Sequence, residues 1–101
     1  MIKITADIDN RSVRAEGHSG FDEKGKDIVC AAVSILIYTY ATELLKLGIP
    51  TDITDDGDVF EIYPNCYKPQ MLYAFEMVLS GLRLLERSYR DNIELEVLKI
   101  G

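Results

Sequence analysis

The sequence predicts an α+β fold, in which a single five-stranded sheet, mostly antiparallel or mixed, packs with two helices. Short segments alternate between apolar and polar residues, and two longer segments repeat apolar residues at helical spacing. Glycine, proline and aspartate separate these segments, as expected for turns. The resulting order is ββαββαβ, and we expect the 101 residues to form one domain spanning 1–101.

The first two strands are expected near the N-terminus. Residues 2–8 alternate between apolar and polar side chains, which is the period of a half-buried strand. Asp9 and Asn10 favour a turn, and the alternation resumes over residues 13–17. We therefore expect an antiparallel hairpin with His18 at the exit of its second strand.

A long helix is predicted over about residues 28–47. Asp27 directly precedes its apolar run and is a typical N-cap residue. Gly48 and Pro50 follow it, as is common after the last turn of a helix. The first half of this helix is apolar on all sides, which predicts a buried central helix.

The second half of the chain repeats the pattern of a hairpin followed by a helix. Residues 51–54 and 59–63 form the predicted strands, with an acidic turn between them. Pro69 suits the first position of a second helix that ends near Arg87. Its predicted buried stripe consists of Met71, Phe75, Val78, Leu82 and Leu85. The alternation over residues 93–97 predicts a last strand.

Composition limits the classes of partner. Eleven basic and 17 acidic side chains give a net charge of −6, which argues against a nucleic-acid binder and suits a basic peptide. We expect no membrane span, because Thr39, Thr42 and Glu43 interrupt the longest apolar stretch before it reaches ~18 residues. The first residues also lack the apolar block of a signal peptide. We therefore expect a cytoplasmic protein whose two cysteines are free thiols.

The only histidine and one of the cysteines lie on either side of a loop that contains glycine. Cys30 falls in the first turn of the predicted helix, where the helix dipole and free backbone N–H groups favour a thiolate. A loop that folds His18 back onto this thiol would pair a cysteine nucleophile with a general base and acid. The N–H groups of the same turn are candidates to stabilise an oxyanion. The alternative is that Cys30 is a buried structural residue.

The surrounding residues suggest further roles. Asp27 either caps the helix or orients the imidazole, as the acid of a catalytic triad does. The loop between His18 and Asp27 resembles a flap, because its glycines permit hinge motion and its acids suit a basic peptide. The predicted flap and substrate-binding residues are Ser19, Gly20, Asp22, Glu23 and Gly25. We expect no metal and no cofactor, since one histidine and two cysteines do not supply a standard four-ligand zinc set.

The motif residues resemble the signature of the ribosomal-processing cysteine protease (Prp) family. The specific part is Gly17-His18 followed by Asp27-Ile28-Val29-Cys30-Ala31-Ala32, and the likeness extends over nearly the whole chain. The resemblance implies that Cys30 is the nucleophile, that His18 is its partner and that Asp27 is a motif acid. Ser19 stands where many members have alanine.

The resemblance also implies a biological role. Members of the family are homodimeric bacterial endopeptidases that remove a short N-terminal extension from a large-subunit ribosomal protein. In the family, cleavage follows an apolar segment with aromatic residues and precedes small and basic residues. Two alternatives stay open from the residues alone, namely a non-catalytic dimeric module that binds a ribosomal protein and a redox sensor that uses the Cys30 thiol.

Overall fold

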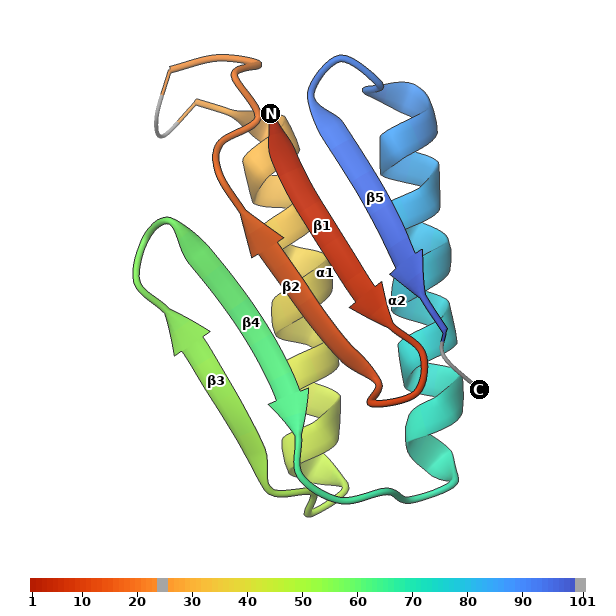
Figure 1. The fold of residues 1–101 in the computed structure, drawn as a ribbon. Helices are drawn as coiled ribbons and strands as arrows, with labels where there is room; N and C mark the ends of the chain where they lie inside the picture. Colours follow the sequence, from red (N-terminus) through yellow and green to blue (C-terminus); the bar gives the residue numbers. More distant parts are fainter. Residues whose placement is uncertain (24–25, 100–101) are drawn as a thin grey trace.

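The predicted fold class and order of elements are confirmed. The computed structural model describes residues 1–23 and 26–99 (Figure 1). Its elements are β1 (Ile2–Asp7), β2 (Ser12–Glu16), α1 (Ile28–Lys46), β3 (Thr51–Asp55), β4 (Val59–Pro64), α2 (Gln70–Ser88) and β5 (Ile93–Leu98).

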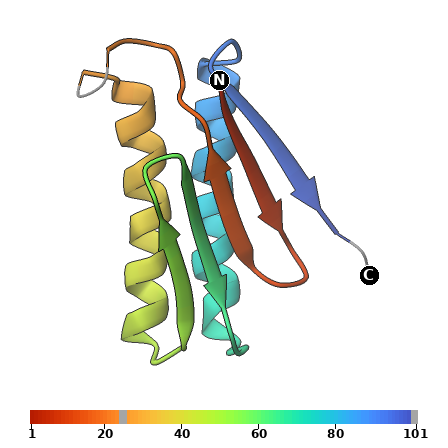
Figure 2. The same cartoon turned by 60° about the vertical axis from the view of Figure 1, so that its left-hand side comes forward.

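The five strands form one mixed sheet in the order β3-β4-β2-β1-β5. β1 and β5 run parallel, and every other neighbouring pair is antiparallel. Both helices lie against the same face of the sheet (Figure 2). As a result, the connection from β2 to α1 and the turn from α2 to β5 lie at the same end of the molecule (Figure 1).

The core lies between the sheet and the two helices. Ile2, Ile4 and Ala6, the alternate residues of β1, are at most 3% exposed, as the sequence alternation predicts. The predicted stripe of α2 is also buried at Met71, Phe75, Val78 and Leu82, while Leu85 is half-buried against it. This packing fixes the helices on the sheet and hence fixes where each helix begins.

The expectation that α1 is a buried central helix is wrong. Val29, Val33 and Ile37 face the core, but Ile28 and Ile35 are 57% and 63% exposed. Both helices cover one face of the sheet, so only one side of α1 can pack against it. An apolar sequence on all sides therefore does not show which side is buried.

The expectation about membrane-spanning length is also wrong for α1. This helix is long and apolar enough, by length and composition, to cross a membrane, with a mean hydropathy of 1.8. The core helix of a soluble protein passes the same test, so the finding is weak support for a membrane span. In this fold the buried side of α1 packs against the sheet.

The C-terminal end of α1 forms as predicted. Gly48 has φ of +74°, a left-handed conformation that favours glycine. Its N–H donates to the Leu45 carbonyl at 3.0 Å, and the Ile49 N–H donates to the Leu44 carbonyl at 3.0 Å. These bonds satisfy carbonyls of the last turn and direct the chain into β3.

Candidate active site

A cavity of about 490 Å³ lies between the end of β2, the start of α1 and the β3–β4 hairpin. His18 and Cys30 both line it, so the structure brings the two sequence-predicted residues to one site. The remaining lining residues are Ile2, Ala15, Gly17, Gly20, Asp22, Asp27, Ala31, Val33, Ser34, Tyr38, Asp55, Gly57, Asp58, Val59 and Phe60. The walls are thus largely apolar, with aspartates among them.

The start of α1 positions Cys30. Asp27 has an extended backbone and is the N-cap residue, and its Oδ1 accepts the N–H groups of Val29 and Cys30, each at 3.0 Å. The thiol therefore lies in the first helical turn and is half-buried, as a nucleophile that must meet a substrate requires.

The backbone N–H groups of this turn are not free. In addition to those of Val29 and Cys30, the N–H of Ala31 donates to the Asp27 carbonyl at 3.1 Å. The expectation that the first-turn amides are available for an oxyanion is therefore wrong for these three in this structure. An oxyanion would have to compete with Asp27 for these three N–H groups.

The Asp27 carboxylate is held in its ionised form. The Ser19 hydroxyl donates to its Oδ2, and this bond is the main reason that the pKa of Asp27 falls from 3.8 to about 2. Burial opposes the shift, while hydrogen bonds from the backbone and side chain of Cys30 favour it. Asp27 is thus a charged cap at neutral pH, one hydrogen bond away from the candidate nucleophile.

The predicted flap residues differ in where their side chains or backbone lie. Ser19 is 2% exposed and also accepts the Phe21 N–H at 3.1 Å, so its side chain points toward the cap. Gly20 and Asp22 line the cavity, whereas Glu23 is exposed and does not line it. Gly25 lies outside the described residues.

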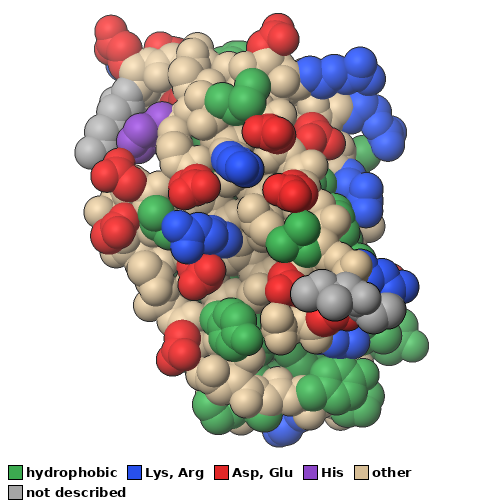
Figure 3. Space-filling model, in the orientation of Figure 1, with side chains coloured by type: hydrophobic (Ala, Val, Ile, Leu, Met, Phe, Trp, Pro, Cys, Tyr) green, Lys and Arg blue, Asp and Glu red, His purple; other side chains and the backbone are tan. Residues whose placement is uncertain are grey.

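His18 lies at the exit of β2, as predicted, and its side chain is 62% exposed. The histidine is visible at the surface of the molecule in Figure 3. Gly17 precedes it with φ of +86°, and a Cβ there would lie 2.7 Å from the Met1 carbonyl oxygen. Glycine is therefore required at position 17, where the chain turns sharply after β2 and places His18 at the cavity.

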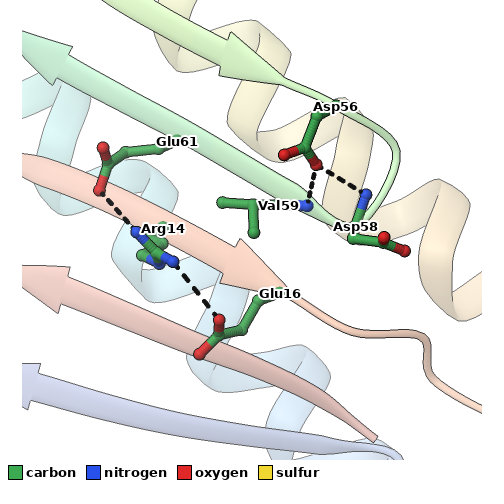
Figure 4. Close-up of polar contacts among 6 residues, drawn as sticks. All are labelled: Arg14, Glu16, Asp56, Asp58, Val59 and Glu61. Atoms are coloured by element: carbon green, nitrogen blue, oxygen red, sulfur yellow. Dashed lines mark hydrogen bonds and ion pairs between the residues drawn. The ribbon is translucent and has the colours of Figure 1, made fainter.

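The acid beside His18 is Asp58, which sequence reasoning missed. Asp58 Oδ1 lies 3.5 Å from His18 Nε2, and its carbonyl accepts the Gly17 N–H at 3.0 Å. The turn itself is closed by Asp56, whose Oδ1 accepts the N–H groups of Asp58 and Val59 at 3.0 and 2.8 Å (Figure 4). These bonds lower the pKa of Asp56 below its usual value.

On another wall of the cavity, a side chain of α1 contacts the β3–β4 hairpin. The Tyr38 hydroxyl donates to Asp55 Oδ2 at 2.6 Å, and its ring lies 4.4 Å from that of Phe60. The hydrogen bond to Asp55 is the main reason that the pKa of Tyr38 is raised. No sequence pattern distinguished Tyr38 from the other tyrosines as the residue that would reach the hairpin.

The second cysteine lies apart from this site. Cys66 is exposed in the connection between β4 and α2 and does not line the cavity. Within residues 1–23 and 26–99, no three His, Cys, Asp or Glu residues are grouped so that they could hold a metal ion.

Comparison with known proteins identifies the family. The profile of the family described as Cysteine protease Prp matches residues 1–94. A Mycoplasma genitalium protein named Ribosomal processing cysteine protease Prp is 55% identical over 95 residues, covering 92% of each chain. A Mycoplasma pneumoniae protein of the same name is 32% identical over 98 residues, covering 95% of this chain and 94% of its own length.

Solved structures agree with this result. The crystal structure of an essential ribosomal processing protease Prp from S. aureus, with a covalently linked product peptide, superposes with a TM-score of 0.86. It is 26% identical, and the match covers 97% of this chain and 100% of that one. The chain therefore belongs to the Prp cysteine protease family and is a hydrolase that acts on peptide bonds.

Proposed function

We propose that this protease removes the N-terminal extension of a large-subunit ribosomal protein, with Cys30 as nucleophile and His18 as general base and acid. The observation that carries the proposal is that the only histidine and the first-turn cysteine of α1 line one cavity. The names of the relatives, ribosomal processing cysteine proteases, supply the substrate class.

The proposed chemistry has two steps. His18 takes the thiol proton, and the Cys30 thiolate attacks the carbonyl carbon of the scissile peptide bond. His18 then gives the proton to the leaving amine, which leaves a thioester on Cys30. A water molecule, deprotonated by His18, hydrolyses this thioester and releases the acid product and the free thiol.

The cavity suits the proposed substrate. Its walls include the side chains of Val59 and Phe60, which favour apolar residues on one side of the cleaved bond. Asp22, Asp55 and Asp58 also line it and favour a positively charged residue nearby. An apolar, aromatic segment followed by small and basic residues meets both preferences.

The rest of the proposal follows the family. We infer a bacterial, cytoplasmic homodimer in which each chain is one domain of residues 1–101, without a nucleic-acid or membrane partner. The net charge of −6 supports the absence of nucleic-acid binding.

The test is cleavage of a synthetic peptide that spans the processing site of the host's ribosomal protein, read by mass spectrometry. Wild type, Cys30→Ala and His18→Ala are compared with Cys66→Ala as the matched control, because Cys66 is the other free cysteine. We expect one cut by wild type and by Cys66→Ala, and no cut by Cys30→Ala or His18→Ala.

The alternatives give different results. A non-catalytic binding module would hold the peptide equally in all four proteins and cut it in none. A redox sensor would lose its sensing function in Cys30→Ala and keep it in His18→Ala. Cutting that survives Cys30→Ala would contradict the proposed nucleophile.

A further inference from the structure

The segment that follows His18 is attached to a distant part of the chain. The Asn92 side-chain amide donates to the Ser19 carbonyl at 2.9 Å. Two residues further along, the Phe21 ring packs edge-on against Tyr89, with ring centroids 5.5 Å apart. The turn between α2 and β5 therefore holds residues 19–21, the first part of the active-site loop between His18 and Asp27. Both segments lie at the same end of the molecule (Figure 1).

This turn is itself firmly held. The Asn92 N–H donates to the Tyr89 carbonyl at 2.9 Å, and the Tyr89 N–H donates to the Leu85 carbonyl of α2 at 2.8 Å. The Asn92 carbonyl accepts the Ile2 N–H of β1 at 2.8 Å. Asn92 is thus tied to both α2 and the start of β1, so it offers a fixed point for the residues that follow His18.

The residue that Asn92 holds, Ser19, is linked to both members of the proposed catalytic pair. Ser19 directly follows His18, so fixing its carbonyl fixes the Ser19–Gly20 peptide unit, one residue away from the imidazole. The Ser19 hydroxyl in turn donates to Asp27, which caps the helix that bears Cys30. Ser19 therefore connects Asn92 with the segment that carries His18 and, through its own hydroxyl, with the cap of the helix that bears Cys30.

We propose that Asn92 is a positioning residue for the Cys30–His18 pair, acting through the Ser19 carbonyl. The proposal rests on the proposed function of this pair. It requires the N–H donor of the Asn92 side chain, because the atom it meets is a carbonyl oxygen. The hydrogen bond from the Ser19 hydroxyl to Asp27 is a separate contact, and substitutions at position 92 remove neither of its partners.

The test uses the isosteric substitution Asn92→Asp, which replaces the donor with an acceptor. Asn10→Asp is the matched control, since the Asn10 side chain donates to Asp7 at 2.8 Å in the β1–β2 turn, at the other end of the sheet. We expect Asn92→Asp to lower kcat about tenfold and to leave KM within about twofold, because the loss is one of alignment. Asn92→Gln keeps the donor and is expected to recover most of kcat.

A second measurement separates positioning from general stability. The chain has one histidine, so its imidazole NMR signals report on His18 alone. They should shift in Asn92→Asp and stay in place in Asn10→Asp at the same pH. Equal kcat values and equal imidazole signals in the two variants would overturn the proposal, and so would an equal loss in Asn92→Gln and Asn92→Asp. If wild type cuts no peptide, the proposed function fails, and the imidazole signals still decide the role of Asn92.

Discussion

The two helices begin in different ways, although each has 19 residues and a free cysteine at or near its start. α1 begins with a carboxylate that accepts two backbone N–H groups, and Cys30 lies in the turn so capped. α2 begins at Gln70 after the N-cap residue Pro69, which has no side-chain acceptor, and Cys66 lies exposed in the preceding connection. Only the capped start carries a cysteine that shares a cavity with the histidine.

The contacts around each start explain the difference. At α2, Lys68 Nζ donates to the Leu47 carbonyl at 2.6 Å and so joins the start of one helix to the end of the other. At α1, Ser19 joins the cap to the segment that carries His18. The start of α2 therefore serves packing, whereas the start of α1 connects the helix to the active-site loop.

Apart from the loss of Cys30 itself, the largest expected effect comes from replacing His18, which lines the same cavity as the start of α1. His18→Gln is expected to lower kcat by roughly 10²–10⁴-fold, which is the range for loss of general acid–base catalysis. Single-turnover kinetics with the ribosomal-protein peptide measure this loss. A change of less than about threefold would show that His18 has no catalytic role.

The next effect compares the two helix starts directly. Asp27→Ala removes the cap of α1 and is expected to lower kcat by about tenfold, because Cys30 loses its fixed position. It should also lower the melting temperature, since the N–H groups of Val29 and Cys30 lose their acceptor. Pro69→Ala at the start of α2 is the control and should leave kcat unchanged. Equal changes in kcat in the two variants would remove the distinction between the helix starts.

A smaller effect concerns the pH dependence of the cap. The pKa of Asp27 is about 2 in the folded chain against 3.8 ordinarily, so its ionised form stabilises the fold above about pH 4. This contribution is lost as the pH falls from 3.8 toward 2. Ser19→Ala removes the main cause of the shift, so the loss should occur at higher pH. Carboxyl NMR titration of Asp27 in both proteins checks this, and an unchanged midpoint would contradict it.

The smallest effect is expected at the acid beside His18. Asp58 and His18 are 86% and 62% exposed and 3.5 Å apart, and exposed ion pairs contribute little. Asp58→Asn is therefore expected to change kcat by at most about threefold. A loss comparable to that of His18→Gln would instead make Asp58 a member of a catalytic triad.

Local features of the fold were predictable from the sequence. The alternation of β1, the cap at Asp27 and the end of α1 at Gly48 depend on neighbouring residues, and each forms as expected. The exposed side of α1 was not predictable, because its apolar residues occur on every face. Likewise, the contacts of Asp58 with His18 and of Asn92 with Ser19 join residues far apart in the chain.

The proposed role of Cys30 as nucleophile depends on the capped start of α1. Its most direct test is the intact mass of the enzyme after rapid acid quenching during peptide turnover, followed by digestion to locate any adduct. We expect the acyl fragment of the peptide on Cys30, none on Cys66, and none in Cys30→Ala. An adduct on Cys66, or peptide cleavage that continues in Cys30→Ala, would contradict it.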